Sequence, residues 1–176
     1  MSGRGAALLA IARHAIAERL GTPGPLPPAP PMPERRGVFV TLRQRSDHGL
    51  RGCVGLVEPR ESLGEAVRRA AVLAAFEDTR FPPVVLAELP SLRIDVSVLG
   101  PLAPAAAEAI EVGRHGVVVR RDERSALFLP QVATEQGWDR DTLLSQLCRK
   151  AGLPADAWRR PECTLFTFET ATFEED

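Results

Sequence analysis

The chain has 176 residues, with 22 Lys and Arg against 23 Asp and Glu and a formal net charge of −1. Hydrophobic residues make up 44% and charged residues 26%, which excludes a disordered tail, a coiled coil, a collagen-like fibre and a basic module that binds nucleic acid by charge alone. The length suits one compact domain or two small lobes that share a core, and every apolar run is far shorter than a membrane span. We therefore expect a soluble globular protein with no membrane segment.

The first predicted helix covers residues 5–20, where apolar residues recur at helical spacing and Gly21 provides a stop. A proline-rich connector follows at 22–33, within a stretch of thirteen residues that holds seven prolines. Because proline fixes φ and removes a backbone donor, we expect an extended segment. We interpret it as a strap lying over the body of the protein; the alternative is a ligand for a proline-recognising domain.

Two strands are predicted next, at 37–44 and 50–58, and the turn residues at 45–49 between them indicate a hairpin. Gly52 and Gly55 are unusual inside a strand. Such glycines are typical of a bulge or of a place where another group approaches the backbone closely.

The strongest helical pattern spans 61–78, with Ser62 as the cap and Glu65 completing a capping box. A proline-bounded loop with one helical turn is expected after it, followed by a strand at 91–100.

The second half repeats this order. The elements predicted there are a linker with a short helix (103–113), two strands (116–121 and 125–130), two helices (129–137 and 139–152) and a last strand (163–173). Each half therefore reads as hairpin, helix, strand, which suggests a structural duplication with subdomains at about 36–100 and 101–174. This order predicts an α+β fold with mainly antiparallel sheet and helices packed on one side of each sheet.

Cysteines are present at positions 53, 148 and 163, and no CxxC pair occurs, so we expect no structural zinc site. The three histidines are also far apart in the sequence, and we expect neither a metal nor an organic cofactor. The N-terminal residues do not resemble a signal peptide, so we expect free thiols in a reducing, cytoplasmic compartment.

The first candidate site is the segment 50–55, where Cys53 lies between Gly52 and Gly55 and Arg51 stands two residues before it. A thiolate is nucleophilic, nearby positive charge favours it, and flanking glycines leave it uncovered. Residues i and i+2 share a strand face about 7 Å apart, so Arg51 could bind an anion beside Cys53. The alternative is a small buried cysteine in a strand relieved by glycine.

The second candidate is the loop that ends the main helix, with Asp78, Arg80 and Phe81. Arg80 could clamp a carboxylate or phosphate with two hydrogen bonds. The alternative is that Arg80 interacts with Asp78 or with the last carbonyls of the helix.

The third candidate is His115, in a glycine-bounded turn before a strand, where it could act as a base or proton shuttle. The alternative is a turn histidine that hydrogen-bonds the backbone. A local patch of Arg120, Arg121 and Arg124 leaves nucleic-acid binding as a further alternative, which the net charge of −1 disfavours.

Six segments in order resemble the AMMECR1 family. They are LRGCVG (50–55), FEDTRFPPV (76–84), ELPSLRIDVSVL (88–99), VGRHGVVV (112–119), LFLPQVATEQGWD (127–139) and LCRKAGL (147–153). The family motif reads LRGCIG, so Val54 is a mild departure. The resemblance implies an α+β fold of two subdomains with a cleft, a cytoplasmic protein, and site positions at the Cys53 strand, the Arg80 loop and the His115 turn. The size suggests protein A of the AmmeMemoRadiSam system, which groups this domain with a Memo-family protein and a radical SAM protein.

Two hypotheses of function follow. In the first, Cys53 is a nucleophile or redox thiol, Arg51 and Arg80 bind an anionic small-molecule substrate with Gly52, Gly55 and Phe81 beside it, and Asp78 or His115 handles protons. In the second, the protein is a non-catalytic module that binds a Memo-family or radical SAM partner.

Overall fold

The computed structural model describes residues 3–26 and 28–176. The chain forms two compact units: one comprises the chain up to Leu99 together with Ala171–Asp176, and the other comprises Gly100–Thr170. The division near residue 100 lies where the sequence changes from one hairpin–helix–strand set to the next. The C-terminal six residues belong to the first unit.

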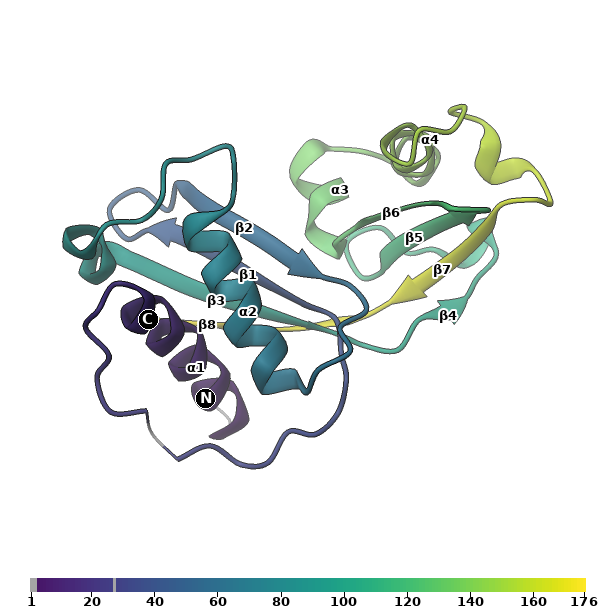
Figure 1. Ribbon diagram of the computed structural model, residues 1–176. Helices are drawn as coiled ribbons and strands as arrows, with labels where there is room; N and C mark the ends of the chain where they lie inside the picture. Colours follow the sequence, from purple (N-terminus) through teal and green to yellow (C-terminus); the bar gives the residue numbers. More distant parts are fainter. Residues whose placement is uncertain (1–2, 27) are drawn as a thin grey trace. The chain divides into compact units, whose positions relative to one another are not determined.

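The first unit is a four-stranded sheet with two helices, seen in Figure 1 with α1 and α2 side by side. Its elements are α1 (Gly3–Arg19), β1 (Val38–Gln44), β2 (Leu50–Leu56), α2 (Leu63–Phe76), the 3₁₀ helix η1 (Leu86–Ser91), β3 (Leu92–Leu99) and β8 (Thr170–Glu174). The strand order is β2-β1-β3-β8, and β1 pairs antiparallel with both β2 and β3. The predicted hairpin is confirmed.

The core of this unit lies between the helices and one face of the sheet. Alternate residues of β1 and β3 are fully or almost fully buried there: Val38, Val40, Leu42, Leu92, Ile94, Val96 and Val98. The period of two thus places one side of each strand against the apolar stripes of α1 and α2. At the start of α2 the Glu65 carboxylate accepts hydrogen bonds from the backbone N–H and the hydroxyl of Ser62, which also lower its pKa. This is the predicted capping interaction.

The second unit also holds a four-stranded sheet, of order β4-β7-β5-β6. Its elements are β4 (Ala103–Pro104), η2 (Ala107–Ala109), β5 (Gly116–Arg121), β6 (Arg124–Phe128), α3 (Pro130–Gln136), α4 (Arg140–Lys150), η3 (Ala157–Arg159) and β7 (Thr164–Phe168). Val117, Val119 and Leu165 pack with α3 and α4 in a separate core. Asp139 caps α4 by accepting from the Thr142 N–H at 2.8 Å.

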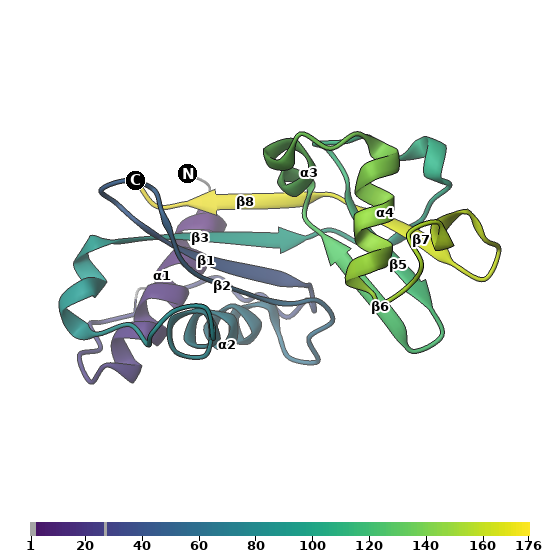
Figure 2. The ribbon, with the colours of Figure 1, turned by 90° about the horizontal axis from the view of Figure 1, so that it is seen from above.

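The prediction of one last strand at 163–173 is wrong, because two strands occupy this stretch and they belong to different sheets. β7 pairs with β5 in the second sheet, whereas β8 lies beside β3 in the first (Figure 2). The backbone N–H of Gly100 donates to the Glu169 carbonyl at 2.7 Å, and the Glu175 N–H donates to the Ile94 carbonyl at 3.1 Å. The apolar residues do not keep one phase over this stretch, since Phe166 and Phe168 occupy even positions and Ala171 and Phe173 odd ones. The sheet that each strand joins is decided by segments far away in the chain.

The two sheets have the same strand order. In each, the second strand of a hairpin lies at the edge, the first strand comes next, and the strand that follows the helices comes third. The fourth strand is exchanged: β4, which follows β3 in the chain, joins the second sheet, and β8, which follows β7, joins the first.

The proline-rich connector contains neither helix nor strand among its described residues, and Pro27 lies outside them. Its end lies on the start of α2, where the Leu63 N–H donates to the carbonyls of Met32 and Glu34 at 3.3 and 2.9 Å. These contacts agree with the interpretation of a strap. Over the described ranges 3–26 and 28–176, no helix combines the length and apolar character needed to cross a membrane.

Candidate functional site

Three polar side chains form a row across the first sheet. Thr41 of β1 is the register partner of Cys53 on β2 and of Asp95 on β3. Directly opposed residues project from the same face, and the buried neighbours Val40 and Leu42 project from the other. The row therefore lies on the face away from the helix-covered core. The Cys53 Sγ and Thr41 Oγ1 are 3.3 Å apart, a hydrogen-bonding distance for sulfur.

The backbone of Cys53 is held by side chains from the loop after α2. β2 is an edge strand, and the Cys53 N–H donates to Asp78 Oδ2 at 2.9 Å while the Cys53 carbonyl accepts from Arg80 Nη2 at 3.3 Å. Asp78 and Arg80 are themselves joined by two hydrogen bonds, Nε to Oδ1 at 2.9 Å and Nη2 to Oδ2 at 2.7 Å. We call this arrangement the Asp78–Arg80 clamp. It satisfies the outward groups of the edge strand, as a neighbouring strand would.

The clamp fixes the charge of both its members. The hydrogen bonds from Arg80 hold the pKa of Asp78 well below its usual range, because they outweigh the effect of burial. The pKa of Arg80 is raised, chiefly by its hydrogen bonds to the Asp78 carboxylate. The Asp78 side chain is 7% exposed and that of Arg80 is 56% exposed. Asp78 is thus ionised at neutral pH, and Arg80 presents a cation to solvent, 5.5 Å from the centroid of the Phe81 ring.

Arg51 is engaged away from the thiol. Its Nε and Nη2 donate to the two carboxylate oxygens of Glu88 in η1, at 3.0 and 3.1 Å, and these bonds lower the pKa of Glu88. The residue is 8% exposed, and its Nη1 has no hydrogen-bond partner among the described residues. The pairing of β1 with β2 shifts register between Leu42 and Arg43, next to Arg51. This irregularity is the bulge that the glycine pattern indicated.

The two glycines of the motif have separate packing reasons. A Cβ at Gly52 would lie 2.2 Å from the Ala74 carbonyl oxygen, so Gly52 lets α2 approach β2. A Cβ at Gly55 would lie 2.2 Å from the ring of Phe39, its cross-strand partner. Both positions are explained by close approach, as the sequence predicted. The thiol between them is half-buried and is not part of the apolar core.

Asp95, at the other end of the row, is 7% exposed and lies between two arginines. Its Oδ2 accepts from Arg43 Nε at 3.2 Å and from Arg93 Nη2 at 3.4 Å. Its Oδ1 has no hydrogen-bond partner within the described chain. Burial raises the pKa of Asp95, with Arg93 and Arg43 opposing the shift and Glu174 adding to it. The pKa of Asp95 on β3 and that of Asp78 in the loop after α2 therefore move in opposite directions.

His115 belongs to the second unit, whereas every residue that contacts Cys53 in the row and the clamp belongs to the first. Its Nδ1 accepts a hydrogen bond from the Glu111 N–H at 3.1 Å. This is the backbone contact that the alternative interpretation expected of a turn histidine. Among the described residues, no group of three or more His, Cys, Asp or Glu side chains is placed to hold a metal ion.

Sequence reasoning identified Cys53, Asp78 and Arg80, which the structure brings together. It missed Thr41, Glu88 and Asp95. The alternation in β1 could have placed Thr41 on the polar face, but only the register shows that it stands opposite Cys53. Asp95 is an acidic residue inside an apolar strand, and that pattern was the available signal.

Comparison with known proteins agrees with this architecture. The AMMECR1 family model matches residues 9–173. "Protein MK0488" of Methanopyrus kandleri is 45% identical over 180 residues, covering 96% of this chain and 87% of that protein. A protein of Methanothermobacter thermautotrophicus is 43% identical over 185 residues, covering 98% and 94%. The crystal structure of the uncharacterized protein PH0010 from Pyrococcus horikoshii superposes with a TM-score of 0.85 at 40% identity, covering 96% of this chain and 90% of that one. The predicted resemblance is confirmed, and the chain belongs to the AMMECR1 family.

Proposed function

We propose that the protein has a Cys53-dependent activity on a small anionic substrate, at a site centred on residues 50–55. The observation that carries this proposal is the half-buried Cys53 thiol, whose backbone is fixed by the Asp78–Arg80 clamp while its Sγ lies 3.3 Å from the hydroxyl of Thr41. A reactive side chain must be held in position while its reactive atom stays available. The Asp78–Arg80 clamp binds the backbone N–H and C=O of Cys53 and does not use its Sγ.

Arg80 is the cation best placed to bind the substrate anion. Its Nε and Nη2 are used within the clamp, and its Nη1 has no hydrogen bond in the part of the chain that the structure describes. Arg51 and Arg80 are both paired with a carboxylate, but the Arg51 side chain is 10% exposed and that of Arg80 is 56% exposed, so only Arg80 offers an anion an open approach. We therefore assign substrate binding to Arg80, with Phe81 beside it, and a supporting role to Arg51.

Asp78 has a low pKa and makes a poor proton acceptor at neutral pH. The pKa of Asp95 is shifted the other way, and Thr41 stands between Asp95 and the thiol. We assign proton exchange to Asp95 through the row, and a positioning role to Asp78.

Alkylation of the native protein with iodoacetamide, read for each cysteine by peptide mass spectrometry, tests this proposal. Cys53 is expected to react first, whereas Cys148 is fully buried and burial raises its pKa. Arg80→Gln should slow the reaction at Cys53. Arg69→Gln, which removes an equally exposed arginine that pairs with Glu61, should leave it unchanged. If Cys53 reacts only after unfolding, the proposal fails.

We propose further that the chain works with a Memo-family protein and a radical SAM protein, as an AmmeMemoRadiSam component. Family membership supports this assignment. The second candidate function, a non-catalytic binding module, is favoured by three exposed apolar side chains around the Arg51–Glu88 pair: Leu50, Val85 and Leu86. A pull-down with purified partners tests this second function. If the protein is a non-catalytic binding module, the Cys53→Ser variant should still bind the partner and the Leu86→Asp variant should not.

A further inference from the structure

Two arginines face each other at the closed end of the β5–β6 hairpin. Arg121 and Arg124 are register partners, the last pair before the turn at Asp122 and Glu123. Cross-strand partners project from the same face of a sheet, and like charges directly opposite each other are destabilising. The hairpin therefore holds two guanidinium groups in a position that favours an anion between them.

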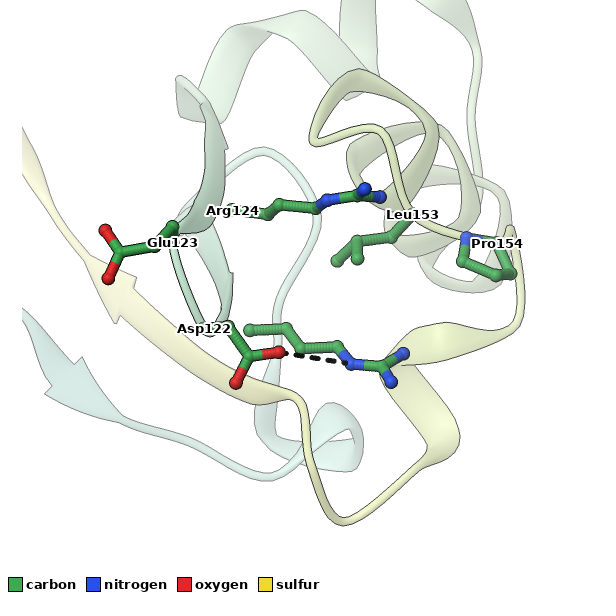
Figure 3. A pocket seen from close by; sticks show the side chains of 6 residues that line it. Asp122, Glu123, Arg124, Leu153 and Pro154 are labelled. Atoms are coloured by element: carbon green, nitrogen blue, oxygen red, sulfur yellow. Dashed lines mark ion pairs between the residues drawn. The ribbon is translucent and has the colours of Figure 1, made fainter.

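The same two residues line a hollow of about 350 Å³ in the second unit, together with Asp122, Glu123, Leu153 and Pro154. Figure 3 shows the Arg124 side chain extended along one side of this hollow toward the segment that holds Leu153 and Pro154. The Glu123 carboxylate points away from it. The hollow is thus bounded by two arginines and the Asp122 carboxylate of the hairpin and by apolar groups from the segment after α4.

Neither arginine is neutralised by a hydrogen-bonded carboxylate in the described part of the chain. Arg121 has an ion pair with Asp122 at 4.0 Å, and the Asp122 side chain is 89% exposed. Arg124 Nη1 donates to the Gly152 carbonyl, which orients the side chain without compensating its charge. Arg51 and Arg80 show the contrast, since each makes two hydrogen bonds to one carboxylate.

We propose that this hollow binds a small phosphate monoester. Two guanidinium groups offer planar pairs of donors that match the oxygens of a dianionic phosphate. The volume lies within the range of small-molecule sites and leaves room for the ester group against Leu153 and Pro154. The site uses no residue of the Cys53 row or clamp, and it stands whether or not Cys53 is reactive.

The strand geometry favours a compact ligand over a nucleic acid. Adjacent strand residues project to opposite faces, so Arg120 does not share the face of Arg121. Arg120 instead lies over the ring of Phe166, 5.0 Å from its centroid. The patch of three arginines seen in the sequence is therefore divided, and two of its members converge on one position.

A titration of the full ¹⁵N-labelled chain with phenyl phosphate, followed by amide chemical shifts, tests the proposal. Saturable shifts are expected at residues 121–124, 152 and 153, at lower concentrations than with inorganic phosphate or benzoate. Arg121→Gln should weaken binding by about tenfold, the loss typical of a charge-assisted hydrogen bond. Arg120→Gln removes the same charge from the opposite face and should weaken binding less than about twofold.

Three results would overturn the proposal: no saturable shift, equal weakening by Arg120→Gln and Arg121→Gln, or binding of benzoate as tight as that of phenyl phosphate. Tighter binding of a short single-stranded oligonucleotide, with shifts that spread beyond the hollow, would also overturn it and identify a nucleic-acid surface. If Arg121→Gln lowers the melting temperature, Arg124→Lys replaces it. This variant keeps the charge and a donor for Gly152 but loses the planar pair, and it should also weaken phenyl phosphate binding.

Discussion

In the first sheet the edge strand β2 has both outward backbone groups of Cys53 bound by side chains, the carboxylate of Asp78 and the guanidinium of Arg80. In the second sheet the edge strand β6 occupies the same place in the strand order, and its Leu127 carbonyl accepts from Lys150 Nζ at 3.0 Å. Charged side chains cover both edges, which is a common protection against pairing with another chain. The coverings differ because one is a donor–acceptor pair and the other a single donor.

The two edge strands thus have the same place in the topology but differ in the side chains that bind their backbones. A single lysine satisfies one carbonyl and leaves the rest of β6 to the packing of α4. The Asp78–Arg80 clamp satisfies the N–H and the C=O of one residue, and that residue carries a thiol on the polar face of the sheet. The strand order is therefore the same in both units, whereas the residue held at the edge strand is a cysteine in the first unit and a leucine in the second.

The largest effect is expected where β2 meets α2. In Gly52→Ala the new Cβ would lie 2.2 Å from the Ala74 carbonyl oxygen, so helix and strand must separate. We expect a loss of about 3 kcal/mol in the free energy of unfolding, measured by urea denaturation. Gly64→Ala is the control, since its Cβ would be 3.6 Å from Ile11 Cδ1 and alanine favours a helix by about 0.5 kcal/mol. Equal stability of the two variants would show that β2 is not fixed by this contact.

The Asp78–Arg80 clamp should contribute more to the free energy of unfolding than the hydrogen bond from Lys150 to the Leu127 carbonyl does. Asp78→Asn replaces a charged acceptor of four hydrogen bonds, and we expect a loss of about 2 kcal/mol at pH 7. Because the folded pKa of Asp78 is lowered, its stabilisation is present above the unfolded pKa near 4 and is lost as pH falls toward the folded value. Unfolding midpoints of wild type and variant should therefore converge below pH 4. A difference that is independent of pH would contradict the clamp's electrostatic origin.

Removal of the hydrogen bond from Lys150 should lower the stability by a smaller amount. Lys150→Met should cost about 1 kcal/mol, because the Leu127 carbonyl loses its side-chain donor. Arg149→Met removes the same charge from the same end of α4, with an exposed side chain, and controls for the helix dipole. Thermal unfolding of the two variants measures the difference. If the two variants are equally stable, the hydrogen bond from Lys150 to β6 contributes nothing to stability, and the difference from the Asp78–Arg80 clamp is larger than expected.

The smallest effect should have the opposite sign. Burial raises the pKa of Asp95, so its ionised form is less stable in the folded chain than in the unfolded one. Asp95→Asn should therefore leave stability at pH 7 unchanged or raise it by less than about 1 kcal/mol. The difference from wild type should shrink as pH falls below the folded pKa and vanish below the unfolded pKa near 4. A clear loss of stability at pH 7 would show that Arg43 and Arg93 outweigh burial.

Local patterns predicted most of the fold. The capping box at Ser62, the hairpin of β1 and β2, and the buried alternation of β3 depend on residues close in the chain, and all three are present. The prediction of a single strand at 163–173 failed because the apolar residues change phase near Glu169, where the backbone passes from one sheet to the other. Which strand pairs with which is decided by distant segments and not by period.

The candidate site shows the same division. Residue type and spacing alone singled out Cys53, the loop at Asp78 and Arg80, and the glycines that permit close packing. Only the tertiary structure decided that Arg51 would be neutralised by Glu88, 37 positions away, and that Thr41 and Asp95 would stand in line with the thiol. The physical reason is that the periodicity of apolar side chains, which indicates a helix or a strand, can be recognised within a few consecutive residues. Cross-strand register and edge hydrogen bonds form only when segments far apart in the chain come into contact.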